Sequence, residues 1–351
     1  MKNEKPSRKG AQGAKIKIRK QELVCFRGLA TLRLFVKLLR FAEQPQQGRK
    51  AMRKKHRYFI PLVALFCIAT PGWAQLGMFS KEQRMELTRQ WQGERFPDGR
   101  PKVPDEVLDS LKTVDAEEAW GVLRHAGYPN QFEGGWKVIN PGERLVGRVV
   151  TAVFMPLRPD VNAVIKERGQ QEGRVGAQNS WVIDTLQPGD VLVVDLFGKI
   201  KDGTFAGDNL GTSIFAKSHT GLIVDGAVRD VTGLSEIKGF RVYVRDFDPS
   251  ALSNVTLMGI NVPIRIGQAT VMPGDVAVSD PEGITFVPPH LAQKVAEEAQ
   301  MTHLIDEWGH MMLREGKYTP GEIDGKWTKP MIEEFNKFVE QKGSKLRMKE
   351  E

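Results

Sequence analysis

One stretch of the chain, residues 204–230, carries acidic, basic and glycine residues at a spacing that suits the binding of a small oxo-acid. Gly207-Asp208 lies near its start and Arg229-Asp230 at its end, with twenty residues between Asp208 and Arg229. The guanidinium of Arg229 offers a planar pair of donors for a carboxylate. The carboxylate of Asp230 offers the hard oxygen ligands that Mg²⁺ or Mn²⁺ prefers. Together these groups can hold a 2-oxo acid chelated to a divalent metal.

A strand–loop–helix–strand–loop unit must bring these residues together. The sequence predicts a loop at 207–210, a helix at 210–218, a strand at 221–224 and a second loop at 225–230. The glycine of the first loop lets the backbone turn sharply and exposes the N–H groups of its neighbours. These N–H groups lie at the start of a helix, where the helix dipole favours an anion. Because adjacent strands place both loops at the same sheet edge, we expect a ligand site there.

The rest of the chain predicts one α/β domain with helical additions at both ends. Short β-branched runs separated by Gly and Pro predict strands at 145–154, 181–183, 191–196, 221–224, 242–244, 263–266, 275–278 and 284–287. Helices are predicted between them at 161–168 and 210–218, and such alternation is typical of an α/β fold. Apolar spacing predicts a helix over 107–122, and further helices over 291–315 and 329–342. The predicted domains are therefore a helical segment at 75–114, an α/β domain at 115–290 and a helical extension at 291–351.

The sequence pattern PGDVxVxD occurs twice, at 188–195 and at 273–280. Each copy predicts a Pro-Gly turn that leads into a half-buried strand. We interpret the pattern as a turn signal between structural elements, with no chemical role. Two copies do not make a repeat protein.

The positive charge of the chain is concentrated in its first 74 residues. They hold 18 Lys/Arg and 3 Asp/Glu, which leaves 33 basic and 40 acidic residues in 75–351. A basic groove for nucleic acid is therefore not expected in the globular part. Both cysteines, Cys25 and Cys67, also precede residue 75, so no thiol nucleophile or Cys-ligated metal is expected after it.

Residues 52–74 have the three parts of a secretory signal peptide, namely a basic start, a short apolar run and a small-residue exit. We expect cleavage after Ala74, a periplasmic or secreted protein, and no stable membrane anchor afterwards. We also expect residue 52 to be the true start and 1–51 to be a mis-assigned or disordered basic extension. The competing interpretation is an unusually long charged region before the apolar run.

The stretch at 204–230 resembles the RraA-like family, which includes 4-hydroxy-4-methyl-2-oxoglutarate aldolases, oxaloacetate decarboxylases and regulators of ribonuclease activity. Catalytic members carry an Asp, twenty residues and then Arg-Asp, as Asp208, Arg229 and Asp230 do here. The segment 273–288 is similar to the closing strands of the family, and the resemblance covers roughly residues 115–300. It implies a layered α/β domain with a central β core and flanking helices.

The resemblance also implies a role for each site residue. Asp230 would be the metal ligand, and Arg229 would bind the substrate carboxylate and keto oxygen. The backbone N–H groups of Asn209 and Leu210 would bind the oxo-acid carboxylate, and Gly207 would allow its approach. Asp208 would orient a water on the metal that handles the proton. Regulators of the family often lack parts of this set, whereas this chain retains it.

The implied activity is that of a divalent-metal-dependent lyase. It would cleave 4-hydroxy-4-methyl-2-oxoglutarate-type substrates, decarboxylate oxaloacetate, or do both, through a pyruvate enolate. A Schiff base on Lys217 is an alternative route to the enolate, although a solvated Lys217 is the simpler interpretation. The alternative functions are a non-catalytic oxo-acid-binding protein and a protein-interaction regulator. Taken singly, Gly207-Asp208 can be a helix cap and Arg229-Asp230 a surface ion pair, so the interpretation depends on the joint pattern.

A second polar cluster lies on the predicted helix over 291–315. His303, Asp306, Glu307 and His310 share one helix face at a spacing that can bind zinc, although a solvated face is the simpler interpretation. In the family, an acidic residue from the C-terminal helix of a neighbouring subunit can approach the metal, and Glu307 is the candidate here. The resemblance implies a homotrimer or hexamer with sites near subunit boundaries.

Overall fold

The computed structural model describes residues 79–142 and 144–349, which belong to one compact unit. The predicted extension 1–51, the predicted signal peptide 52–74 and both cysteines lie outside the described residues. Within the described ranges, no helix is long and apolar enough to cross a membrane.

The secondary structure alternates between helices and strands as the sequence predicts. The helices are α3 (Lys81–Leu87), α4 (Asp105–Leu111), α5 (Ala116–His125), α6 (Pro159–Gln171), α7 (Gln178–Ile183), α8 (Asp208–Ser218), α9 (Val231–Glu236), the 3₁₀ helix η2 (Pro289–Leu291), α10 (Ala292–Arg314), α11 (Pro320–Ile323) and α12 (Lys329–Gln341). The strands are β1 (Phe132–Gly134), β2 (Lys137–Ile139), β3 (Val146–Pro156), β4 (Asp190–Thr204), β5 (Gly221–Val228), β6 (Arg241–Phe247), β7 (Val255–Ile260), β8 (Ile264–Ile266), β9 (Ala269–Val271), β10 (Val276–Ser279) and β11 (Gly283–Val287).

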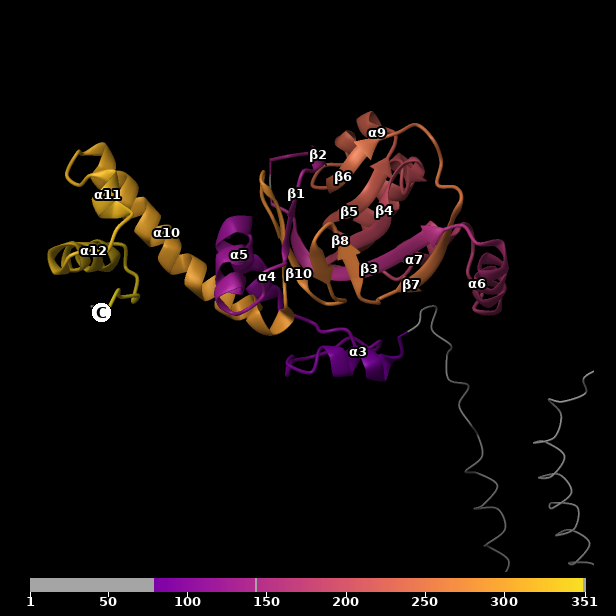
Figure 1. The fold of residues 1–351 in the computed structure, drawn as a ribbon, viewed down its shortest axis with the longest axis horizontal. Coiled ribbons are helices and arrows are strands. Elements are labelled where there is room, and N and C mark those ends of the chain that lie inside the picture. The colour runs from indigo at the N-terminus through magenta and orange to yellow at the C-terminus, as the bar shows by residue number, and fades with distance from the viewer. Residues whose placement is uncertain (1–78, 143, 350–351) are drawn as a thin grey trace, which may run out of the picture. The chain divides into compact units, whose positions relative to one another are not determined.

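A mixed sheet forms the centre of the fold (Figure 1). Its strand order is β1-β11-β10-β3-β4-β5-β6-β2, and β7 pairs with β3 beside this path. The strands β3, β4, β5 and β6 are parallel neighbours, and the other pairings are antiparallel. The prediction of a layered α/β fold with a central β core and flanking helices is therefore confirmed.

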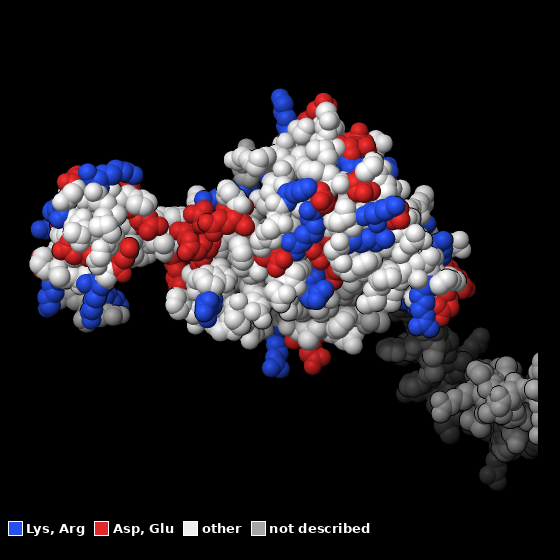
Figure 2. All heavy atoms as spheres, turned by 45° about the horizontal axis from the view of Figure 1, so that its top comes forward, with Lys and Arg blue, Asp and Glu red and all other residues white. Residues whose placement is uncertain are grey.

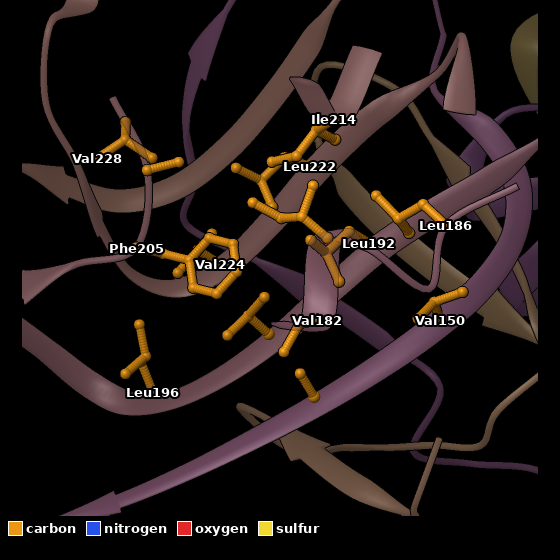
Figure 3. Close-up of a cluster of buried hydrophobic side chains, with 14 of the residues drawn as sticks. Val150, Val182, Leu186, Leu192, Leu196, Phe205, Ile214, Leu222, Val224 and Val228 are labelled. Carbon is orange, nitrogen blue, oxygen red and sulfur yellow. The ribbon is translucent and has the colours of Figure 1, made fainter. Parts of the chain in front are cut away.

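The two faces of the sheet are covered by different layers. Along β4, Leu192 and Val194 pack with helices α6 to α9, and Figure 3 shows Leu192 and Leu222 beside Ile214 of α8. The alternate residues Val191 and Val193 pack on the other face with the β8–β9 hairpin. Both faces of the central strands are thus buried, as expected for parallel strands.

One predicted strand is wrong. Residues 181–183 belong to α7, and the side chains of Trp181, Val182 and Ile183 are all buried. A short, fully buried apolar run has the same pattern in a helix as in a strand, so periodicity could not distinguish them. The helix is tied to the chain that enters the predicted site, because Asn179 Nδ2 donates a hydrogen bond to the carbonyl of Phe205 at 2.8 Å.

The segment before β1 packs closely on the domain. Its helix α3 begins with a capping box, in which Ser80 and Gln83 bond reciprocally. The helix predicted over 107–122 is interrupted, because α4 ends at Leu111 and Asp115 caps α5. Between α3 and α4, the buried guanidinium of Arg100 bonds to Asp190 at the start of β4.

The C-terminal helices have a hydrophobic cluster of their own. Its buried members lie on α10 and α12 and are Trp308, Met312, Met331, Phe335 and Val339. The first half of α10 instead packs with α4 and α5, where Val295 and Ala299 join a separate core cluster. On the face that Figure 2 shows, basic side chains lie among acidic ones, and acidic side chains gather beside the C-terminal helices.

Candidate functional site

The structure brings the predicted site residues together at the carboxyl ends of β4 and β5. The six residues are Gly207, Asp208, Asn209, Leu210, Arg229 and Asp230, and all of them line one cavity of about 890 Å³. The connection between the two loops is direct, because Phe205 N–H donates to Ala227 and Arg229 N–H donates to Ala206. These bonds extend the pairing of β4 with β5 up to the site.

Asp230 lies in a backbone conformation that holds its carboxylate at the cavity. Its φ and ψ are 53° and 44°, the left-handed region, and it caps α9 through the bond from Leu234 N–H to its carbonyl. Asp tolerates this region better than most residues with a Cβ, at a cost of about 1 kcal/mol or more. Strand β5 runs to Val228, further than the predicted loop 225–230 allowed, so only Arg229 and Asp230 separate the strand from α9.

Arg229 and Asp230 form an ion pair that leaves both side chains accessible. Arg229 Nε lies 3.3 Å from Asp230 Oδ2, and the side chains are 42% and 45% exposed. An exposed pair of this kind contributes little to stability. Both groups are therefore available to a ligand.

Gly207 is required by the close approach of this pair. A Cβ built at Gly207 would overlap Asp230 Oδ2 and lie 3.1 Å from Arg229 Nε. Its φ of −112° is open to any residue, so the requirement is for space and not for an unusual backbone. The glycine lets the Asp230 carboxylate rest against the backbone that starts α8.

Asp208 packs against Gly233 of α9, where only a glycine leaves room for its side chain. A Cβ at Gly233 of α9 would lie 2.8 Å from Asp208 Cβ and 2.9 Å from its Oδ2. Asp208 Oδ1 lies 2.7 Å from the N–H of Asn209. Gly233 follows Asp230 by three residues in a short helix. This closeness in the sequence to Arg229 and Asp230 is the signal that could have placed Gly233 at the site.

A further wall of the cavity, on α6, was also missed. Asn162, Lys166, Gln170 and Arg174 all line the cavity. The spacing of four residues places Asn162, Lys166 and Gln170 on one face of α6, part of which was predicted at 161–168, and Arg174 follows just after the end of the helix. The signal was present, but nothing in the sequence placed α6 beside the loops that follow β4 and β5.

Three other candidates, Glu307, His303 and Lys217, lie away from this cavity. Glu307 does not line it and forms an ion pair with Lys342, the C-cap residue of α12. His303, from the same predicted cluster, instead contacts Glu118 of α5 at 3.0 Å. Lys217, the alternative Schiff-base residue, pairs with Asp184 at 3.5 Å. Among residues 79–142 and 144–349, no group of three or more His, Cys, Asp or Glu is placed to hold a metal.

The donor set of the cavity nevertheless fits a magnesium-type ion held mainly by water and substrate. Mg²⁺ commonly keeps several waters and binds to only one or two carboxylates. Asp230 offers one such carboxylate at the cavity, beside the Asp208 carboxylate on the start of α8. A closed zinc site, with three or four protein ligands, does not fit this set.

Comparisons with known proteins find related sequences over the central part of the chain. The family model described as "RraA-like: Aldolase/RraA" matches residues 106–286. A protein of Halalkalibacterium halodurans named "Putative 4-hydroxy-4-methyl-2-oxoglutarate aldolase" is 32% identical over 120 residues, which cover 34% of this chain and 56% of that protein. The chain thus spans just over half the length of this curated relative.

Solved structures show the same fold. The crystal structure of Streptomyces coelicolor RraAS2, described as an unusual member of the RNase ES inhibitor RraA protein family, is 27% identical with a TM-score of 0.52. The match covers 60% of this chain and 99% of that one. An uncharacterized protein from Pseudomonas syringae pv. tomato has a TM-score of 0.53 at 22% identity, covering 66% of this chain and 99% of its own, and supports the fold alone.

Proposed function

The chain belongs to the RraA-like family, and from this premise we propose that it is a divalent-metal-dependent lyase that acts on 2-oxo acids. Its reactions would be retro-aldol cleavage of 4-hydroxy-4-methyl-2-oxoglutarate-type substrates, decarboxylation of oxaloacetate, or both. One observation carries the proposal: Arg229 and Asp230 lie against Gly207, at the start of α8, and face a cavity with both charged groups accessible. The curated relative named as an aldolase supports the reaction class.

Arg229 and the start of α8 would bind the oxo-acid end of the substrate. The guanidinium has donors for both the carboxylate and the keto oxygen, and the first-turn N–H groups of α8 favour an anion. A divalent metal at Asp230 would supply further positive charge next to the keto oxygen. Negative charge develops on this oxygen as the C3–C4 bond breaks, so the positive charge of Arg229 stabilises the transition state more than the ground state.

The bond changes balance without an external reactant. In the aldol substrate, the C4 hydroxyl loses its proton, the C3–C4 bond breaks, and its electron pair forms the enolate of pyruvate. The proton then returns to C3, so one molecule of substrate gives two of pyruvate. In oxaloacetate, the departing group is CO₂, and C3 takes its proton from solvent. Asp208 would position the water that carries this proton.

Substrate binding would release Asp208 for this role. Asp208 Oδ1 lies 2.7 Å from the N–H of Asn209, one of the N–H groups expected to bind the substrate carboxylate. A carboxylate that takes this N–H must displace Asp208 Oδ1. The displaced carboxylate would then have a free acceptor for a water molecule.

A second candidate function is non-catalytic regulation. The support is the likeness to the RraAS2 structure, whose description names an RNase ES inhibitor family. The accessible Arg229–Asp230 pair is the observation that favours catalysis. Saturable binding of a 2-oxo acid with no turnover would favour an oxo-acid-binding protein instead.

We also propose export and assembly as predicted from the sequence. The basic and apolar run at 52–74 supports cleavage after Ala74 and a periplasmic or secreted location. Intact-mass analysis of the exported protein tests this, because retention of residues 52–74 would contradict it.

The family supports a homotrimer or hexamer, in which Glu307 of a neighbouring subunit would approach the metal. Light scattering tests the assembly, and a monomer with full activity would contradict the role of Glu307.

The decisive experiment is pyruvate release from oxaloacetate by the purified protein, with Mg²⁺ and with a chelator. Asp230→Asn removes the charge and keeps the size of the side chain, so we expect a loss of at least about 100-fold, as for other groups that stabilise transition-state charge. Asp324→Asn, at an exposed aspartate outside the cavity, is the matched control. Because free metal decarboxylates oxaloacetate slowly, Asp230→Asn also serves as the blank. Wild-type activity no higher than this blank would reject oxaloacetate as a substrate.

A further inference from the structure

One face of α6 is built as a polar wall of the cavity. Helix packing determines which face this is, because Ile165 is buried and a Cβ at Gly169 would overlap the Trp181 ring. The close contact between Gly169 and Trp181 fixes the rotation of α6 about its axis. It thereby turns Lys166 and Gln170 toward the cavity, where both are lining residues.

The polar groups of this wall are engaged to different degrees. Asn162 Oδ1 accepts a hydrogen bond from Gln178 at 3.0 Å. Arg174 Nε lies 3.3 Å from Glu172, and its Nη1 donates to the carbonyl of Trp181 at 2.9 Å. Lys166 lines the same cavity, and in the described part of the chain no carboxylate lies within ion-pair distance of its ammonium. Its charge is therefore available to a ligand.

The size of the cavity leaves room for a ligand that reaches from the loops to α6. Its volume of about 890 Å³ lies in the upper part of the range of about 300–1,000 Å³ that is typical of sites for drug-sized ligands. A four-carbon acid such as oxaloacetate is far smaller than such a ligand. Arg229 and Lys166 line the same cavity, so a substrate with one end at Arg229 has room for a chain longer than that of oxaloacetate on the side of Lys166.

We propose that the α6 wall is a distal subsite, in which Lys166 binds a second carboxylate at the far end of a 2-oxo acid longer than oxaloacetate. This inference rests on the proposed function, because it takes the oxo-acid end of the same ligand to lie at Arg229 and Asp230. An ammonium is a compact point charge on a flexible stem, so Lys166 can follow carboxylates at somewhat different reach. The amide of Gln170, one helical turn away, adds a neutral donor.

The test compares ligands that differ only in the distal carboxylate. Binding of 2-oxoglutarate, 2-oxoadipate and 2-oxopimelate to the full chain is measured by calorimetry with Mg²⁺ present. Each is compared with the unbranched monocarboxylic 2-oxo acid of the same carbon number. These ligands lack the C4 hydroxyl and are not retro-aldol substrates, so the measurement does not depend on turnover.

Lys166→Met removes the charge and keeps most of the length of the side chain. We expect it to weaken binding of the best diacid about tenfold, the size of one charge-assisted hydrogen bond, and to change binding of the monoacid less than about twofold. Lys166→Arg should restore most of the preference for the diacid. Lys294→Met is the matched control, because Lys294 is a partly exposed lysine on α10 outside the cavity.

The outcomes separate the subsite from the reaction. A diacid preference that survives in Lys166→Met, or an equal loss for diacid and monoacid, would overturn the subsite even if oxaloacetate is turned over. A preference that depends on Lys166 in a protein without turnover would keep the subsite and reject the lyase. No binding of any 2-oxo acid would reject both.

Discussion

Charged side chains at the two ends of the parallel strands have opposite environments. At the carboxyl ends of β4 and β5, Arg229 and Asp230 are 42% and 45% exposed and contact each other at 3.3 Å. At the amino ends of β3 and β4, Arg148 and Asp190 are buried. Asp190, with 0% of its side chain exposed, is held by two bonds from Arg100 at 2.7 and 3.0 Å.

The difference separates charged side chains that pair with each other in the interior from charged side chains that stay accessible to a ligand. A buried charge must be paired and hydrogen-bonded, and the two Nη atoms of Arg100 both bond to the Asp190 carboxylate, so the paired atoms have little capacity for a ligand. An exposed pair is weakly coupled and can be reorganised by a ligand at small cost. The amino ends therefore carry stability, and the carboxyl ends carry the candidate chemistry.

The largest effect that this comparison predicts is on stability. Arg100→Met would leave the Asp190 carboxylate buried without its partner, so we expect the free energy of unfolding to fall by about 3–5 kcal/mol. Activity per folded molecule should stay near that of the wild type. Chemical denaturation, with activity measured on the folded fraction, checks both expectations. Arg158→Met is the control, because its pair with Asp160 is exposed and should be worth about 1 kcal/mol or less.

The double variant Arg100→Met/Asp190→Asn covers the case in which the single variant does not fold. Removing both charges should recover much of the lost stability, because no uncompensated charge remains. A single variant as stable as the wild type would contradict the structural role of the pair. Low activity in a stable double variant would contradict the separation of the two ends.

The next effect is on activity at the opposite end of the sheet. Gly207→Ala places a methyl group against the Asp230 carboxylate and the Arg229 side chain. We expect kcat/KM to fall about 100-fold, since displacements near 1 Å at a reacting centre cost about this much. The free energy of unfolding should change by about 1 kcal/mol or less. Gly121→Ala in α5 is the control, because its added Cβ meets nothing within 4 Å.

The candidate loops could be predicted from the sequence because their information is local. Spacing and residue type placed Asp208 and Arg229 after neighbouring strands, and the strand order brings those strand ends together. The α6 wall could not be predicted, although its four-residue spacing is visible. Its place at the cavity depends on the contact between Gly169 and Trp181, and Trp181 was assigned to the wrong kind of element.

The two PGDVxVxD turns show the same limit within one pattern. In both, a carboxylate accepts the N–H of the residue three positions earlier, as Asp190 does from Gln187 and Asp275 from Met272. Both glycines have positive φ, so the turn itself followed from the pattern. The pairing of Asp190 did not, because its partner Arg100 lies 90 residues away.

Asp275 gives a prediction of intermediate size. Burial raises the pKa of its carboxyl to about 8, only partly opposed by the bond from Met272 N–H. In the unfolded chain this pKa is about 3.9, so between about pH 4 and pH 8 the folded protein holds a proton that the unfolded chain has lost. This group therefore lowers stability as the pH rises through that window, by up to about 1.4 kcal/mol per pH unit, with no further loss above about pH 8.

Asp275→Asn should remove this contribution while keeping an oxygen that accepts the Met272 N–H. Between pH 6 and pH 7, we expect the wild type to lose about 1.4 kcal/mol relative to the variant, as measured by denaturation at each pH. Asp190→Asn is the contrast. Arg100 lies beside the Asp190 carboxyl, so removing the charge of Asp190 leaves a buried guanidinium without its charged partner. Parallel stability curves for Asp275→Asn and the wild type would show that Asp275 is ionised in the folded protein.

The smallest expected effect is on stability at the cavity. Asp230→Gly removes the side chain from a left-handed position, which relieves about 1–2 kcal/mol of backbone strain and costs about 0.5–1 kcal/mol in the entropy of the unfolded chain. The ion pair with Arg229 is exposed and adds little, so the free energy of unfolding should change by about 1 kcal/mol or less. Activity should fall as far as in Asp230→Asn, because both variants lose the carboxylate. If denaturation instead showed a loss as large as that of Arg100→Met, Asp230 would be a structural charge. The two ends of the sheet would then no longer divide stability from chemistry.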